Sequence, residues 1–223
     1  MATDGNLSRD GRHLVLKSKD RDLLETFRSC LGITASITRS RSGGGRWYWQ
    51  VQWSDTVLYG WLTGIGLTPA KSLTLGTLGV PDEHFADFLR GCIDGDGSIR
   101  VYTDRFHAPK HPKYVYLRLV VSLVSASPSF VSWMRETIGR LRGPRGSVSA
   151  TQRAPGRRLW CLKYGKRESL ELIDWMYHAS DVPCLARKRD IAAAFLEALP
   201  RRAAPDWRRP HASAKMTSAV PGW

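Results

Sequence analysis

The sequence lacks the features of several protein classes. Its four cysteines are Cys30, Cys92, Cys161 and Cys184, and no two are close enough for a C-x-x-C zinc pair. Their apolar neighbours are typical of reduced thiols in a cytoplasmic core. No apolar run approaches the roughly 20 residues of a membrane span, and no signal-peptide pattern opens the chain. We therefore expect no membrane contact and no secretion, with the cytoplasm as the location and an organelle as the alternative.

Acidic residues are also scarce. The chain of 223 residues has 20 Asp and Glu against 34 Lys and Arg, a net charge of +14. This excess predicts a polyanionic partner, with nucleic acid as the first candidate and a location near the nucleoid. Nine Trp and seven Tyr favour a folded body over a disordered basic arm.

The sequence contains an imperfect internal repeat. Two helical patterns carry apolar residues at offsets 0, 1, 4 and 8 and a glycine at offset 9. Such offsets give one buried helix face, and glycine is the usual residue at a helix C-terminus. An alternating strand follows each pattern. The helical patterns span 23–32 and 130–139, and the alternating strands span 47–53 and 160–164.

The pattern of each half therefore predicts the order strand, strand, helix, strand, strand, helix. We assign 1–80 to the first unit and 81–200 to the second. The segments 101–114 and 151–158 are rich in Pro, His, Lys, Arg and Gly, which predicts loops. The last segment, 201–223, is predicted to be a basic, poorly ordered tail.

An acidic motif follows the central predicted helix. Asp94-Gly95-Asp96-Gly97 ends an apolar stretch, and Asp4-Gly5 stands at the equivalent position of the first half. Asp-Gly also favours simple tight turns, which is the alternative interpretation. The repeat favours a paired role, because two carboxylates side by side can bind a divalent metal ion.

The nine residues 89–97 resemble the motif of the LAGLIDADG homing endonucleases, and the likeness extends over about residues 1–195. The resemblance implies an α/β (α+β) fold in which two pseudo-symmetric αββαββα units form a DNA-binding saddle. It also implies that the central helix packs on a partner helix through Leu89, Gly91 and Ile93. The positions that match the motif are Leu89, Gly91, Ile93, Asp94, Asp96 and Gly97.

The same resemblance implies a metal site. Asp4 and Asp96 would hold Mg²⁺ (or Mn²⁺), assisted by the backbone carbonyls of Thr3 and Gly95. The family's active-site lysine corresponds to Lys71 in the first half and Lys188 in the second. The alternative for each lysine is an ordinary solvated cation at a helix end.

The implied activity is site-specific cleavage of double-stranded DNA at a long asymmetric target by a monomer with internal pseudo-symmetry. The resemblance also implies a gene that is a mobile genetic element, with intron homing as the expected process. Outward strand positions would read bases, and basic hairpins would contact phosphates. The expected DNA-contacting residues are Lys17, Arg39, Arg41, Arg46, Gln50, Gln52, Arg118, Arg145, Arg153, Arg157, Arg158 and Lys163.

The first motif departs from the family pattern. Only Met1-Ala2-Thr3 precedes Asp4, and Ala2 stands where the family has its first Asp. Three explanations are open: a start further upstream, a decaying gene, or a homodimer formed through the motif helix at 89–96. A chain without the first helix is expected to be unstable or poorly active. The alternative function is a non-cleaving DNA- or RNA-binding protein, a maturase or a regulator, or an inactive remnant on the same scaffold.

Overall fold

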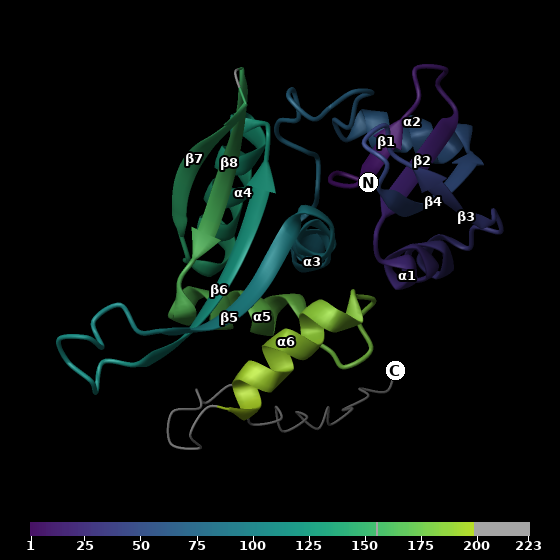
Figure 1. The fold of residues 1–223 in the computed structure, drawn as a ribbon. Helices are drawn as coiled ribbons and strands as arrows, with labels where there is room; N and C mark the ends of the chain where they lie inside the picture. Colours follow the sequence, from purple (N-terminus) through teal and green to yellow (C-terminus); the bar gives the residue numbers. More distant parts are fainter. Residues whose placement is uncertain (155, 199–223) are drawn as a thin grey trace, which may run out of the picture.

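Two four-stranded antiparallel sheets with their helices form the molecule (Figure 1). The computed structural model describes residues 1–154 and 156–198, except for the side chains at 153, 154 and 157. The first sheet has the strand order β1-β2-β4-β3. Its unit consists of β1 (Gly5–Leu7), β2 (His13–Ser18), α1 (Arg21–Leu31), β3 (Ile37–Arg41), β4 (Trp47–Ser54) and α2 (Thr56–Gly64).

The second unit repeats this order and adds helices at both ends. Its sheet has the matching order β5-β6-β8-β7. The expected α+β fold of two αββαββα-like units is confirmed, and four residues precede β1 where α3 precedes β5. The elements are η1 (Asp82–His84), α3 (Phe85–Asp96), β5 (Gly97–Asp104), β6 (Tyr116–Ser125), α4 (Pro128–Arg142), β7 (Ser147–Ala154), β8 (Arg157–Tyr164), α5 (Lys166–Met176) and α6 (Ala186–Glu197).

Local sequence signals account for the helix ends. Gly32 ends α1 with φ 63°, a left-handed conformation that glycine adopts without cost. Ser127 caps α4, because its hydroxyl oxygen accepts a hydrogen bond from the backbone N–H of Phe130, and Pro128 occupies the first helical position. α1 and α4 are the equivalent helices of the two units, and these signals mark the C-terminus of the first and the N-terminus of the second.

Two predicted loops are wrong in extent. Residues 101–104 belong to β5, and much of 151–158 belongs to β7 and β8. The pairing of β5 with β6 places Ile99 opposite Val121 and Val101 opposite Leu119, so both β5 residues pack toward the core. Tertiary pairing thus extends the hairpins through residues whose composition favours loops.

The core is largely shared between the units. One cluster joins Leu7 and Leu14 of the first sheet to residues of α3, the second sheet and α5. A smaller cluster of Leu16, Leu24 and Val51 lies under α1. Among the helices of residues 1–154 and 156–198, none is long and apolar enough to span a membrane.

Candidate functional site

The two predicted metal-binding carboxylates meet where the units join. Asp96 is the last residue of α3, and Asp4 immediately precedes β1. A Cβ atom placed on Gly95 would lie 2.1 Å from Thr3 Oγ1 and 3.1 Å from Asp4 Oδ2. The N-terminal segment can therefore approach the end of α3 this closely only because residue 95 has no side chain.

The two carboxylates are near enough for their charges to interact. Burial and then the negative charge of Asp96 raise the pKa of Asp4 to about 6. Burial also raises the pKa of Asp96, although the positive charges of Lys71 and Lys188 act to lower it. A carboxylate pair of this kind carries unfavourable negative charge, which a divalent cation would relieve.

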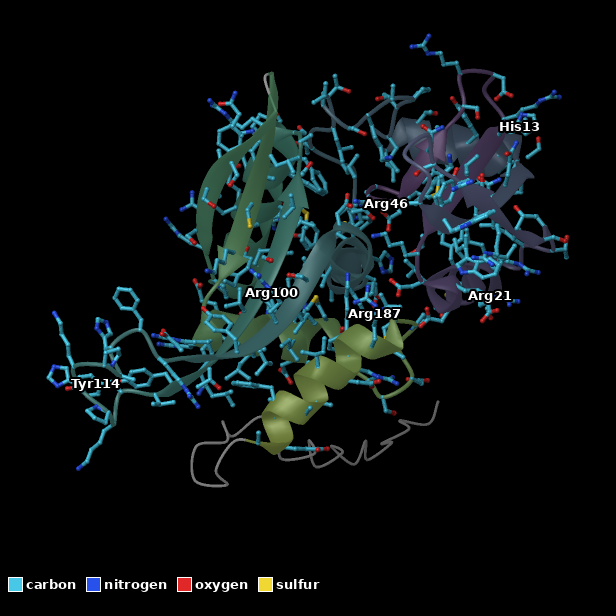
Figure 2. The ribbon with its side chains drawn as sticks, viewed as in Figure 1. His13, Arg21, Arg46, Arg100, Tyr114 and Arg187 are labelled. Atoms are coloured by element: carbon cyan, nitrogen blue, oxygen red, sulfur yellow. The ribbon has the colours of Figure 1, made fainter. Side chains whose placement is uncertain are left out.

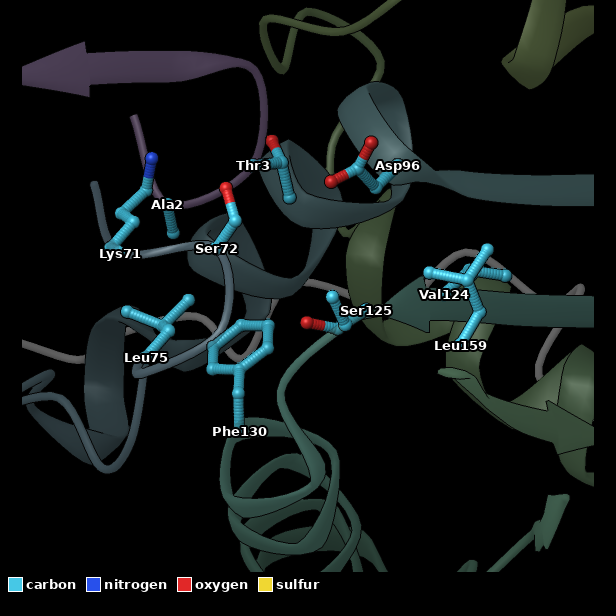
Figure 3. Close-up of a pocket in the computed structure, with 11 residues that line it drawn as sticks. Ala2, Thr3, Lys71, Ser72, Leu75, Asp96, Val124, Ser125, Phe130 and Leu159 are labelled. Atoms are coloured by element: carbon cyan, nitrogen blue, oxygen red, sulfur yellow. The ribbon is translucent and has the colours of Figure 1, made fainter. Parts of the chain in front are cut away.

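A cleft of about 260 Å³ opens beside this pair and is lined by Asp96, whereas Asp4 lines a neighbouring groove. Figure 3 shows Asp96 at one end and Lys71 at the other, with Thr3, Ser72 and Ser125 between them. The cleft therefore places an ammonium group and hydroxyl groups, which can donate hydrogen bonds to a phosphate group, near the Asp96 carboxylate. Apolar side chains, Leu75 and Phe130 among them, complete the lining.

The two predicted lysines occupy equivalent positions. The ammonium of Lys71 donates a hydrogen bond to the carbonyl of Gly5, the residue after Asp4. The ammonium of Lys188 donates to the carbonyl of Gly97, the residue after Asp96, at 2.8 Å. Burial lowers the pKa of both lysines. The sequence repeat is thus matched by a repeated contact.

Lys188 makes further contacts that Lys71 does not share among the described residues. Its Nζ lies 2.5 Å from the carbonyl oxygen of Ile93 and 2.8 Å from that of Asp94. These carbonyls belong to the last turn of α3, which has no intrahelical partners for them. Lys188 therefore caps α3 and fixes the position of Asp96, a role that its place in the sequence did not reveal.

Buried polar contacts hold Lys188 against α3. The Leu185 N–H donates to Asp94 Oδ2 at 2.9 Å. Arg90 is 5% exposed and donates to the carbonyls of Met176 and Pro183. The sequence did not reveal these contacts of Asp94 and Arg90, because the role of a charged residue at a buried helix position is recognised only when its partners are known.

The donor set fits a hard cation. Among the described residues no group of three or more His, Cys, Asp and Glu side chains gathers. Two carboxylates suffice for Mg²⁺, which retains several waters and uses substrate phosphate oxygens. The Gly95 carbonyl oxygen is 3.4 Å from Lys188 Nζ, and the participation of the Thr3 and Gly95 carbonyls stays a prediction.

Polar residues line the face of the first sheet that points away from the core. Lys17 lies directly opposite Gln50, and Gln52 opposite Val15. Lys17 Nζ also sits 5.3 Å from the centre of the Tyr48 ring. The structure thus brings Lys17, Gln50 and Gln52 onto one face.

The corresponding face of the second sheet carries Arg118 and Lys163. Arg118 lies opposite Tyr102, and Lys163 opposite Ser122. Arg100 shares this face and is exposed, but sequence analysis missed it. The alternation of Ser98, Arg100 and Tyr102 with Ile99 and Val101 was the signal that could have found it.

Other predicted contact residues lie elsewhere. Arg39 pairs with Trp49 on the core-facing side of the first sheet, and Arg158 shares its face of β8 with Trp160, which packs on the core. Arg41 stacks over Trp47, Arg46 lies in the β3–β4 turn, and the Arg145 carbonyl accepts a hydrogen bond from Arg135. The side chains of Arg153 and Arg157 and the tail at 201–223 lie outside the described part of the chain.

The residues predicted at a helix interface divide between two environments. Gly91 is exposed and lines a groove of about 180 Å³ between α3 and the first unit, together with Leu23 and Phe27 of α1. Leu89 and Ile93 are buried in the large core cluster. One face of α3 is therefore only partly covered.

No family model and no curated protein matches the sequence. Solved structures do match the fold. The meganuclease I-SmaMI bound to uncleavable DNA superposes with a TM-score of 0.54 at 11% identity, covering 88% of this chain and 86% of that one. The I-SmaMI LAGLIDADG homing endonuclease bound to cleaved DNA gives 0.54 at 13% identity, covering 86% and 83%.

A mesophilic variant of the homing endonuclease I-DmoI gives a TM-score of 0.50 at 12% identity, covering 81% of this chain and 82% of that one. The chain therefore has the fold of the LAGLIDADG homing endonucleases, as the motif predicted.

Proposed function

We propose that this chain is a site-specific endonuclease that cleaves double-stranded DNA by hydrolysis with Mg²⁺ (or Mn²⁺). The observation that carries the proposal is the Asp4–Asp96 pair at the junction of the units, beside a cleft that contains Lys71. The fold supports it, because I-SmaMI has this fold and is seen with both uncleavable and cleaved DNA.

Each residue of the site has a separate role in this proposal. Asp4 and Asp96 would hold the metal ion, which when bound activates water and stabilises charge on the phosphate. Lys71 has donors left after its contact with Gly5, and it would offset phosphate charge in the cleft. Lys188 is a positioning residue that keeps Asp96 in place through the end of α3.

The two open sheet faces would bind a long target. Gln50 and Gln52 can pair with adenine, and Lys163 with guanine. Arg118 would pair with guanine by exchanging its ion pair with Asp104 for the base. Since the two faces carry different side chains, the target is asymmetric and a single chain reads both halves. This activity fits intron homing by a mobile element that acts near the nucleoid.

The test uses the full chain and a library of random duplexes in plasmids. Sequencing would detect DNA ends that form with Mg²⁺ and not with EDTA. Asp96→Asn is expected to lower cleavage about 10³-fold, because metal-ion stabilisation is worth several kcal/mol. Glu83→Gln, at an exposed carboxylate just before α3, is the control and should cleave normally. Cleavage that survives Asp96→Asn rejects the site.

A second candidate is a maturase or regulator that binds nucleic acid without cutting it, or an inactive remnant. Two observations favour it: Ala2 lacks the carboxylate that Asp94 supplies in the second unit, and both lysines donate to backbone carbonyls. Tight duplex binding without Mg²⁺-dependent ends would select this candidate.

A further inference from the structure

A long hairpin distinguishes the second unit. Residues 102–118, the aromatic arm, contain the end of β5, a connecting loop at 105–115 and the start of β6. Figure 1 shows this hairpin projecting away from the rest of the molecule, and Figure 2 places Tyr114 in its outer part. The equivalent connection of the first unit, at 8–12, is short and has no aromatic residue.

Flat side chains form a column along the aromatic arm. The Arg118 guanidinium lies 5.4 Å from the centre of the Tyr116 ring. The Tyr116 and Tyr114 rings stack at 27° with centroids 6.2 Å apart. The His111 ring follows, with its centroid 4.8 Å from that of Tyr114 and its plane tilted by 47°. The column starts on the open face of the second sheet, where Arg118 lies, and runs outward.

These rings are exposed although the loop is ordered by its own hydrogen bonds. Tyr114 is 45% exposed, Tyr116 47% and Phe106 82%. The His111 N–H donates to the His107 carbonyl at 2.9 Å, and the Tyr114 N–H to the His111 carbonyl at 2.8 Å. The rings therefore contribute little to the core, and a cluster of exposed rings is typical of a contact surface.

The charge of the aromatic arm defines the chemistry of its ligand. Arg105, Lys110 and Lys113 lie in the loop. The single acidic residue of the aromatic arm, Asp104, is neutralised by an ion pair with Arg118 at 3.0 Å. Rings interleaved with cations suit a ligand that alternates flat bases with phosphates.

We propose that the aromatic arm binds unpaired nucleotides of a single-stranded nucleic acid. Bases would stack on the Tyr114–Tyr116 column, and Lys110 and Lys113 would contact the phosphates. The bases of a duplex are already stacked on one another, so an exposed ring column gains contact only with bases that are free. This site is separate from the Asp4–Asp96 pair and goes beyond the proposed cleavage.

Fluorescence anisotropy of the full chain in EDTA tests the proposal with labelled single-stranded DNA and RNA of one sequence. The variant Tyr114→Ala/Tyr116→Ala is expected to bind single strands roughly tenfold more weakly. Tyr114→Phe/Tyr116→Phe keeps the rings and should bind normally. Trp61→Ala removes a similarly exposed ring, 59% exposed on α2, and should also bind normally.

Unchanged affinity of the alanine variant for both single strands overturns the proposal. So does a variant whose only defect is lost binding to vesicles of anionic lipid, since the aromatic arm would then be a membrane contact. A defect with DNA alone or with RNA alone supports the site and identifies its ligand. The alanine variant should retain Mg²⁺-dependent duplex cleavage. Because the binding assay does not depend on cleavage, it tests the aromatic arm even if the chain proves not to cut DNA.

Discussion

The two ends that meet at the candidate site are built differently. In the second unit Asp96 ends a complete helix, whose last carbonyls are capped by Lys188 and whose Asp94 is tied to Leu185. In the first unit, Asp4 is positioned by the contact of Lys71 with Gly5 and by the close approach of Gly95. One carboxylate is thus positioned by its own helix, and the other mainly by its neighbours.

The largest expected difference separates the two lysines. Lys188→Met leaves the buried end of α3 without its cap, so we expect a loss of about 3–5 kcal/mol in the free energy of unfolding. Lys71→Met removes one hydrogen bond and should cost about 1 kcal/mol while lowering cleavage more strongly. Urea unfolding and cleavage assays of both variants make the comparison. Equal losses of stability would show that the lysines have the same role.

The second prediction concerns Asp4 and pH. Folding raises its pKa from 3.8 to about 6, so its ionisation opposes folding; the cost is absent below about pH 4 and complete above about pH 6. Asp4→Asn should therefore raise the free energy of unfolding near pH 8, by up to about 3 kcal/mol, and change little near pH 4. Mg²⁺ should stabilise the wild-type chain and not the variant. Thermal melts that show a stability gain at both pH values would contradict this origin.

Two glycines on α3 offer a third comparison. Gly95→Ala places a Cβ against Thr3 and should cost about 2 kcal/mol, because the N-terminal segment must move. A Cβ on Gly91 meets nothing within 4 Å, so Gly91→Ala should add up to about 1 kcal/mol through helix propensity. Opposite signs in urea unfolding are expected. A loss at Gly91 would mean that a segment covers this face of α3.

The smallest effects concern two contacts at helix starts. Ser127 at the start of α4 contacts Leu75, and Asp20 at the start of α1 contacts Arg187. The Ser127 hydroxyl donates to the Leu75 carbonyl and caps α4, so Ser127→Ala should cost about 1–2 kcal/mol. The Asp20–Arg187 pair at 2.7 Å is more exposed, and Asp20→Ala should cost under about 1 kcal/mol. Added salt should reduce only the Asp20 effect, which denaturation at two ionic strengths would measure.

The repeat could be predicted because it rests on local signals. Apolar offsets with a terminal glycine at 32 and 139 indicated two equivalent helices, and Asp4 and Asp96 were recognised as equivalent from the same register. The sides of the strands were harder. Arg39 and Gln50 lie on neighbouring strands, but their side chains are on opposite faces of the sheet. Only the pairing register shows this, because it places Arg39 opposite Trp49 and Gln50 opposite Lys17.

The amino-acid sequence by itself determined the order of the elements, the charge that favours nucleic acid and the two acidic positions, because periodicity and composition act over a few neighbouring residues. The tertiary structure decided what Lys188 and Arg90 do, how closely Thr3 approaches Gly95, and that the rings of the aromatic arm stay exposed. The contact partners of Lys188, Arg90 and Thr3 lie more than fifty residues away in the sequence. No local pattern specifies such partners.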